Sequence, residues 1–155
     1  MFHRRWSRCR DGDSGGDATS VEMKAVERTQ ITVFLGNRPG VVADLCAALT
    51  REEISIQAMT VLDTVDVGTM RMIVDDPEKA QQALKGTAAA FVLVPVLSLV
   101  IPNRGGAFAE IAATMANAGI NIEYVYATCL PDAPRSLGVF RVSDLATALK
   151  LEYPD

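Results

Sequence analysis

The chain of 155 residues has few of the side chains from which metal sites and catalytic dyads are usually built. Its three cysteines, Cys9, Cys46 and Cys129, form no CxxC pair, so we predict ordinary reduced thiols. A single histidine, His3, cannot form a histidine-based metal site or a catalytic dyad. We therefore expect no metal, no cofactor and no catalytic residue.

Long apolar runs are also missing, and clustered cations are confined to the first ten residues. The longest apolar run, FVLVPVLSLVI at residues 91–101, is interrupted by Pro95 and is shorter than the roughly 18–20 residues of a membrane span. Of 15 Lys and Arg, four lie among the first ten residues, so the remainder carries 11 − 19 = −8. An acidic body argues against nucleic acid and anionic membranes as partners. We expect a cytoplasmic protein.

The N-terminal segment has no periodic pattern. Residues 1–22 are polar and rich in Gly, Ser and Asp, which predicts disorder, and we extend this disordered extension to residue 28. The segment lacks the apolar core of a secretory signal. Because Met23 opens the regular sequence MKAVERTQITVFL, we hypothesise that translation begins there. An intact mass from the native source that includes Met1 would contradict this hypothesis.

The most informative feature present is an internal repeat. Residues 31–62 align without a gap on residues 97–128, at an offset of 97 − 31 = 66. The clearest identities are in one turn, where Asn37, Arg38 and Gly40 recur as Asn103, Arg104 and Gly106.

Each copy has the same order of elements. Short β-branched runs at 31–35 and 97–101 predict buried strands. After the glycine, apolar residues at i, i+3 and i+7 predict an amphipathic helix. Alternating runs at 54–62 and 120–128 predict a second strand.

The first copy continues with a hairpin turn, a returning strand, a helix and a fourth strand, at residues 63–68, 69–74, 75–85 and 91–96. In the helix, Asp76 is the predicted N-cap and Pro77 the first helical residue. The order β-α-β-β-α-β is the split ferredoxin-like unit, an α+β fold with both helices on one face of the sheet.

The second unit is too short to repeat this order in full. Val74 lies 91 − 74 = 17 residues before Phe91, whereas 17 residues after the equivalent Val142 is position 159, beyond the end. We therefore predict two tandem ferredoxin-like units, residues 29–96 and 97–155, of which the second lacks a full last strand. Only LEY remains there as a stub, so we expect an open sheet edge or core flank.

Two tyrosines stand out in the second unit. Tyr124 and Tyr126 are two residues apart, so we predict that they share a face with Ile120 and Ile122. Core packing is the first interpretation and lining of a ligand pocket the second.

The repeated turns suit recognition of an acid. The first turn of a helix leaves N–H groups unpaired and carries partial positive charge, so a carboxylate or phosphate can bind there. Gly40 and Gly106 permit close approach of a ligand to the backbone. The asparagine amides offer a donor and an acceptor, and Arg38 or Arg104 could clamp the acid. The same residues also suit an ordinary turn with solvated arginines, and this alternative stays open.

The segments ITVFLGNRPGVVADLCAALTREEISI and LSLVIPNRGGAFAEIAATMANAGINIEYVYA resemble the ACT domain, the small-molecule regulatory module of amino-acid metabolism. The resemblance covers residues 29 to about 150. The order of these motifs along the chain is similar to that in the stand-alone tandem-ACT proteins of bacteria. It implies a non-catalytic regulatory protein that binds an amino acid or similar metabolite near the turns, at an interface between ACT units. The strands are apolar on both faces, which predicts a homodimer in which a second copy covers one face. Whether the two units pair within the chain or across the dimer stays open.

The resemblance also implies site residues. In the first unit these are Asn37, Arg38, Pro39, Gly40, Val41, Val42, Ser55 and Ile56, and in the second Asn103, Arg104, Gly105, Gly106, Ala107, Phe108, Asn121 and Ile122. The two copies depart from the family pattern at Ser55, which replaces an asparagine, and at Gly105, which replaces the proline.

Two other functions are open to the same fold. Acylphosphatases share it and use an arginine-bearing loop between strand one and helix one, a part that Arg38 or Arg104 could play. However, their phosphate loop is longer and richer in glycine than the turns written here. A ligand-free dimerisation module is the third possibility.

Overall fold

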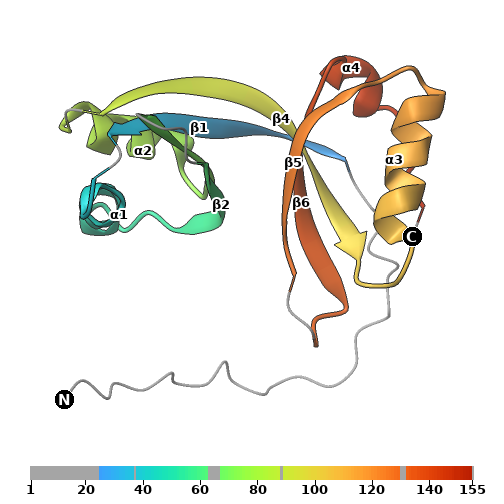
Figure 1. The fold of residues 1–155 in the computed structure, drawn as a ribbon, viewed down its shortest axis with the longest axis horizontal. Helices are drawn as coiled ribbons and strands as arrows, with labels where there is room; N and C mark the ends of the chain where they lie inside the picture. The colour runs from blue at the N-terminus through green and yellow to red at the C-terminus, as the bar shows by residue number, and fades with distance from the viewer. Residues whose placement is uncertain (1–24, 37, 63–66, 88, 130–131, 155) are drawn as a thin grey trace.

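The computed structural model describes residues 25–36, 38–62, 67–87, 89–129 and 132–154, and it confirms the α+β class (Figure 1). One six-stranded antiparallel sheet has the strand order β2-β3-β1-β4-β6-β5. The strands are β1 (Val26–Gly36), β2 (Ile56–Leu62), β3 (Val67–Val74), β4 (Ala90–Pro102), β5 (Ile122–Thr128) and β6 (Arg135–Val142). The helices are α1 (Val41–Arg51), α2 (Pro77–Lys85), α3 (Ala107–Asn117) and α4 (Leu145–Ala148). None of these helices is long and apolar enough to cross a membrane.

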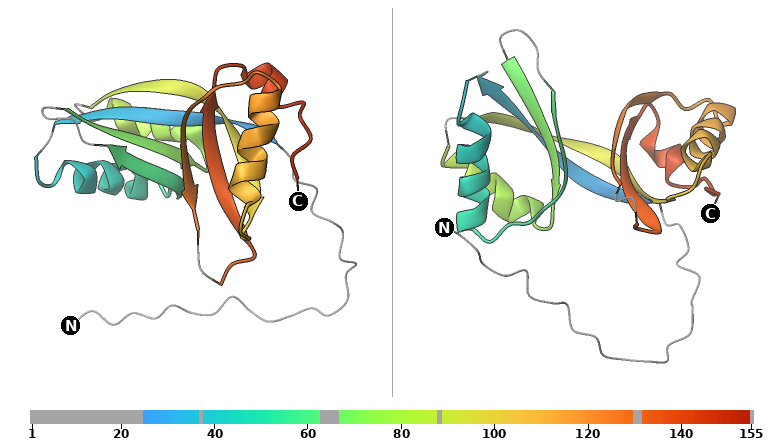
Figure 2. Two further views of the ribbon diagram at one scale, coloured as in Figure 1. Left: turned by 45° about the vertical axis from the view of Figure 1, so that its right-hand side comes forward. Right: turned by 60° about the horizontal axis from the view of Figure 1, so that its bottom comes forward.

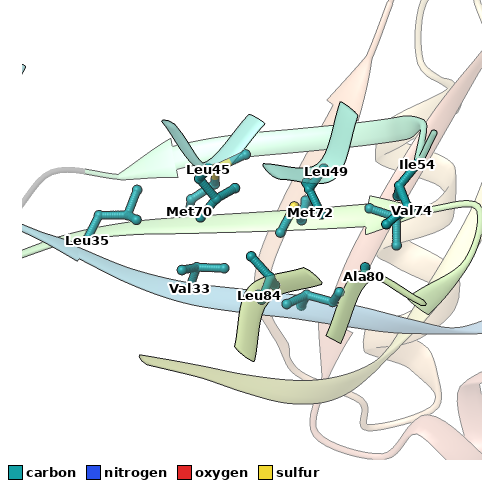
Figure 3. Close-up of a cluster of buried hydrophobic side chains, with 11 residues drawn as sticks. Val33, Leu35, Leu45, Leu49, Ile54, Met70, Met72, Val74, Ala80 and Leu84 are labelled. Carbon is teal, nitrogen blue, oxygen red and sulfur yellow. The ribbon is translucent and has the colours of Figure 1, made fainter. Parts of the chain in front are cut away.

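The first unit forms around the predicted apolar positions. Val33 of β1 and Met70 and Met72 of β3 are fully buried. Figure 3 shows Leu45 and Leu49 of α1 over the two methionines and Leu84 of α2 beside Val33. The predicted cap is confirmed, because the Asp76 carboxylate accepts a hydrogen bond from a backbone N–H in the first turn of α2. This core holds the start of α1 against the end of β1, which fixes the first turn in place.

The two units share their central strands. The predicted strands at 91–96 and 97–101 are a single strand, β4, whose first part closes the first unit and whose second part opens the second. β1 lies antiparallel to β4 with Thr29 opposite Pro95, and 95 − 29 = 66 is the repeat offset. The repeat therefore relates the two units by an approximate two-fold axis through this pair (Figure 2).

The start of β1 provides the strand that the second unit lacks. Val26–Arg28 pair with Val96–Ser98, on the side of β4 that faces away from β6. Two predictions are therefore wrong: residues 26–28 are strand rather than disordered extension, and the flank of the second unit is covered. The physical reason is that β4 continues past the first unit, so its unpaired backbone groups there are satisfied by extending β1.

The last residues add a side chain, not a strand, to the second unit. Residues 151–154 have no strand partner, and Tyr153 is buried in the core beside α4. The Tyr153 hydroxyl donates a hydrogen bond to the carbonyl of Ala148 at 2.9 Å. The predicted stub LEY therefore anchors the C-terminal segment through one aromatic ring.

This ring predicts a loss of stability in alkali. Burial raises the pKa of Tyr153 to about 12. An unfolded tyrosine titrates near pH 10, so the stability from the neutral phenol is complete below about pH 10 and is lost as the pH rises towards 12. We expect the free energy of unfolding to fall by up to about 1.4 kcal/mol per pH unit from this group. Denaturant titrations at several pH values between about 8 and 11 should show that the free energy of unfolding falls less steeply with pH in Tyr153→Phe than in the wild type. An equal fall in the two proteins would contradict the assignment.

The face of the sheet that bears no helices is also packed. Ala58, Ile73, Val96 and Val139 from both units form a third buried cluster, with Tyr126 packed against it. Tyr124 and Tyr126 therefore do not share a face with Ile122, which packs in the core under the helices. A register shift between Ile122 and Tyr124 is the cause, because an extra residue in a strand exchanges the faces of all later side chains.

A buried amide joins the two units across this cluster. Gln30 of β1 is fully buried, and its Nε2 donates to the hydroxyls of Thr32 and Tyr124 at 2.8 and 2.7 Å. Its Oε1 accepts from the hydroxyl of Tyr126 at 3.1 Å. The guanidinium of Arg71 lies 4.2 Å from the centre of the Tyr124 ring, a cation–π contact. The two units are thus fixed to one another by shared strands and by polar contacts.

Candidate functional site

The two turns have the same backbone. Gly40 and Gly106 both adopt left-handed conformations, with φ of 92° and 89°. In each turn the N–H of the arginine donates to the carbonyl two residues earlier, at 2.9 Å in both. Glycine is required here because other residues rarely adopt this φ. Duplication has therefore kept the backbone, and the turns differ only in their side chains and surroundings.

The first turn presents an uncapped helix end. Within the described residues, no side chain caps the N-terminus of α1. The N–H groups of its first turn therefore remain available and carry partial positive charge. A Cβ added at Gly40 would meet no atom within 4 Å, so the space in front of this helix end is open.

A cavity of about 340 Å³ lies at this turn. It is formed by the end of β1, the start of α1 and the connection from α2 to β4, and its lining is Phe34, Leu35, Gly36, Arg38, Val41, Asp44, Leu45, Thr87 and Ala89. A smaller cavity of about 190 Å³ adjoins it and extends to Val42, Val61, Leu62 and Gly68. The larger volume is at the small end of the roughly 300–1,000 Å³ typical of ligand pockets, which suits a small metabolite.

The cavity carries one charge of each sign on an apolar lining. Arg38 and Asp44 are both exposed at its edge, and within the described part of the chain no ion pair joins them. A cation beside a helix N-terminus suits a carboxylate, and a separate carboxylate suits an ammonium. The arrangement can therefore hold a zwitterion with an uncharged side chain.

The second turn is closed by its own side chains. Glu110, which corresponds to Asp44 because 110 − 44 = 66, accepts two hydrogen bonds from Arg104, at 2.8 and 2.7 Å. These bonds from Arg104, with its positive charge, lower the pKa of Glu110. A Cβ added at Gly106 would lie 3.7 Å from the Glu110 carboxylate, so this carboxylate lies directly in front of the turn.

The longer hairpin of the second unit also reaches its turn. Asn103 donates through Nδ2 to the carbonyl of Ala133 at 2.9 Å, and its backbone N–H donates to the carbonyl of Pro134 at 2.9 Å. Residues 133 and 134 belong to the β5–β6 connection, which the sequence shows to be longer than its counterpart. The asparagine of the second turn is therefore engaged within the protein.

The predicted site residues divide into separate groups. Arg38 and Val41 line the larger cavity and Val42 the smaller one, while Asn37 lies outside the described residues. In the second turn Ala107 is buried in the core, and the ring of Phe108 stacks on a core phenylalanine with centroids 6.0 Å apart. The remaining turn residues are exposed: Pro39, Gly40, Arg104, Gly105 and Gly106.

The starts of the second strands lie elsewhere in the same unit. Ser55 and Ile56 follow the C-terminal end of α1, whereas the turn precedes its N-terminal end. The 11 residues of α1 separate them by about 16 Å. Asn121 and Ile122 stand in the same relation to the second turn, beyond the end of α3. One unit therefore cannot present both sets of residues to one small ligand.

Several residues that line the cavity were not predicted from the sequence. Asp44 carried a usable signal, since it lies one helical turn after Gly40 and matches Glu110 in the repeat. Thr87 and Ala89 carried none, because their loop follows a different helix and meets the turn only through packing. Phe34 and Leu45 read as ordinary strand and helix apolar residues.

Comparisons with known proteins agree with this fold. A family model described as an ACT domain pair matches residues 26–150. The structure is similar to protein BT0572 from Bacteroides thetaiotaomicron, with 29% identity, TM-score 0.76, and coverage of 81% of this chain and 86% of that one. It is also similar in fold to the regulatory subunit of aspartate kinase from Thermus thermophilus (19% identity, TM-score 0.59, 82% and 89% covered). The same enzyme's regulatory subunit from Thermus flavus has 18% identity and TM-score 0.61, with 83% and 92% covered. No curated protein matches the chain.

Proposed function

Because the chain belongs to the ACT domain pair family, with a small-molecule-binding regulatory role, we propose that it binds a free α-amino acid at its first turn. The ligand carboxylate would meet Arg38 and the N–H groups at the start of α1, and its ammonium would meet Asp44. The role is non-catalytic: the bound amino acid favours one arrangement of the protein, and that arrangement is the signal. We expect this to take place in the cytoplasm.

One observation carries the proposal. The cavity beside the uncapped start of α1 has the two charges that a zwitterion needs, on a largely apolar lining. Phe34, Leu45 and Ala89 provide that lining. We therefore expect the ligand to have an uncharged side chain, since burying an unpaired charge against these residues would be costly.

We propose a homodimer as the working form. Within the described residues, β6 pairs only with the second part of β4, and the Arg141 guanidinium donates to the carbonyl of Pro95 at 2.9 Å, so residues 90–94 keep a free edge on the side away from β1. This segment, AFVLV, has no charged residue, and Val92 and Leu93 are 47% and 42% exposed. An uncharged apolar edge favours association with another copy. A second copy would also bring a strand-two opening close to the first turn, which the same unit cannot do.

A thermal-shift screen with the twenty amino acids tests the function. Ligand at 100 times its Kd adds about 2.7 kcal/mol of stability, so one or a few uncharged amino acids should raise the Tm clearly. Sedimentation with and without the stabilising amino acid reports association. The proposal fails if no amino acid shifts the Tm and calorimetry with the same set also detects no heat of binding.

Replacing Gly40 by valine should abolish binding and leave the fold. The position has open space, so the cost is the strain of a left-handed valine, about 1–2 kcal/mol. The new side chain would project into the space in front of the helix end and exclude the ligand. Gly106→Val is the matched control, because Gly106 has nearly the same φ: it should lose similar stability and keep its affinity. Calorimetric titration measures both, and wild-type affinity in Gly40→Val would remove the first turn from the site.

A further inference from the structure

The two turns share one backbone but differ in what lies in front of the glycine. In the second turn a carboxylate of the protein, Glu110, lies there and is held by two hydrogen bonds to Arg104. In the first turn the same place is open, and the corresponding Asp44 makes no ion pair within the described residues. The Glu110 side chain is longer than the Asp44 side chain by one methylene group.

The Glu110 carboxylate lies in front of Gly106 and takes up Arg104, the cation that a ligand carboxylate would need, although it does not cap α3. An incoming amino acid would have to displace a carboxylate that is tethered to the same helix as the site. A tethered group acts at an effective concentration on the order of millimolar or more, and it gives up little freedom when it binds. A free metabolite at a similar concentration therefore gains little by replacing it.

The asparagine adds a second obstacle at this turn. Asn103 donates its side-chain N–H to the carbonyl of Ala133 at 2.9 Å, so the amide is already used within the chain. Ala107 at the start of α3 is buried in the core, and the neighbouring Phe108 ring stacks against Phe140. The second turn thus has the contacts of a structural joint, whereas the first has the cavity.

We propose that Glu110 stands in for the ligand in the second unit, so that each chain binds one amino acid, at the first turn alone. This inference rests on the proposed function and narrows it to one site per chain. The length of the acidic side chain, Asp44 in α1 and Glu110 in α3, decides which turn binds the amino acid. Asp44 is short enough to leave Arg38 to the ligand carboxylate and to meet the ligand ammonium itself.

A reciprocal exchange of the two acidic side chains tests the inference. Asp44→Glu keeps the charge and adds the one methylene that lets Glu110 reach its arginine in the second unit. We expect this variant to lose at least about ten-fold in affinity, because Arg38 becomes occupied within the chain. Glu110→Asp is the matched control, with the opposite change at the equivalent position, and should bind at the first turn within about two-fold of the wild type.

Isothermal titration of the full-length protein with the amino acid that stabilises it most provides the readout, and circular dichroism checks that each variant is folded. The expected stoichiometry for the wild type is one ligand per chain. Two ligands per chain, or lost binding in Glu110→Asp with unchanged binding in Asp44→Glu, would overturn this inference and leave the proposed function standing. Absence of binding by any amino acid would overturn both.

Discussion

Replacing Gly138 by valine should destabilise the protein by about 3 kcal/mol, through overpacking of the second core. A Cβ built at this position would lie 2.5 Å from Cδ1 of Ile101 and 2.7 Å from Cε2 of Phe140. Both neighbours are buried, at 6% and 0% exposure, and the Phe140 ring is stacked on Phe108. The side chains would have to leave their positions in a close-packed core, which has no space to receive them.

Gly36→Val is the matched control for this change. Gly36 also lies in a strand, at the end of β1, and a Cβ added there would meet no atom within 4 Å. Valine suits a strand, so we expect a change within about 0.5 kcal/mol. Urea titration monitored by circular dichroism measures both variants. Equal stabilities for the two variants would contradict the packing described around Gly138.

Replacing Gln30 by alanine should cost about 2–4 kcal/mol, because the amide is fully buried and joins the two units. The change removes the partner of the Tyr126 hydroxyl and leaves a cavity on the helix-free face of the sheet. Burial against this cluster, reinforced by the nearby Tyr124, already raises the pKa of Tyr126. Leaving the Tyr126 hydroxyl without its hydrogen-bond acceptor in this environment lowers the stability of the fold.

A double-mutant cycle tests whether the cost comes from these hydrogen bonds. Gln30→Leu should be costly alone and less costly when Tyr124 and Tyr126 are both phenylalanine, since the two phenol hydroxyls that bond to Gln30 are then absent and only the Thr32 hydroxyl loses its bond to the amide. Gln82→Ala, at an exposed position of α2, should change the free energy of unfolding by less than about 0.5 kcal/mol. Strict additivity in the cycle would mean that Gln30 stabilises the protein in some other way.

These two predictions depend on a part of the fold that only partly follows from the sequence. The repeat at offset 66, the glycine turns and the order of elements were predictable, because each depends on local pattern and on self-similarity. The role of Val26–Arg28 was not predictable, because their partners, Val96–Ser98, lie 96 − 28 = 68 to 98 − 26 = 72 residues away in the chain. Counting residues predicted an incomplete last strand for the second unit, but it could not show that Val26–Arg28 would pair there.

The face of the tyrosines was mispredicted for a related reason. Strict alternation along a strand assigns Ile122 and Tyr124 to the same face of the sheet. A single register shift between them places them on opposite faces. The first unit has the same irregularity between Ile56 and Ala58, so it is part of the repeat. Bulges of this kind have no strong sequence signal, and they become visible only in the pairing of the strands.

The location of the candidate site was predictable from the sequence, but the side-chain contacts that distinguish the two turns were not. The sequence located both turns and matched Asp44 with Glu110 as a conservative pair. It could not show that the longer side chain reaches Arg104 while the shorter one leaves Arg38 without an ion pair among the described residues. That difference depends on side-chain reach in three dimensions, as does the approach of Thr87 and Ala89 to the first turn.

The most direct test of the central claim is an amide NMR titration of the ¹⁵N-labelled protein with the amino acid that raises its Tm most. We expect the largest chemical-shift changes at the end of β1, in the first turns of α1 and at Thr87 and Ala89. The equivalent segment from Pro102 to Ile111 should remain nearly unchanged. Changes concentrated at the second turn, or at neither turn, would contradict the assignment of the amino-acid site to the first unit.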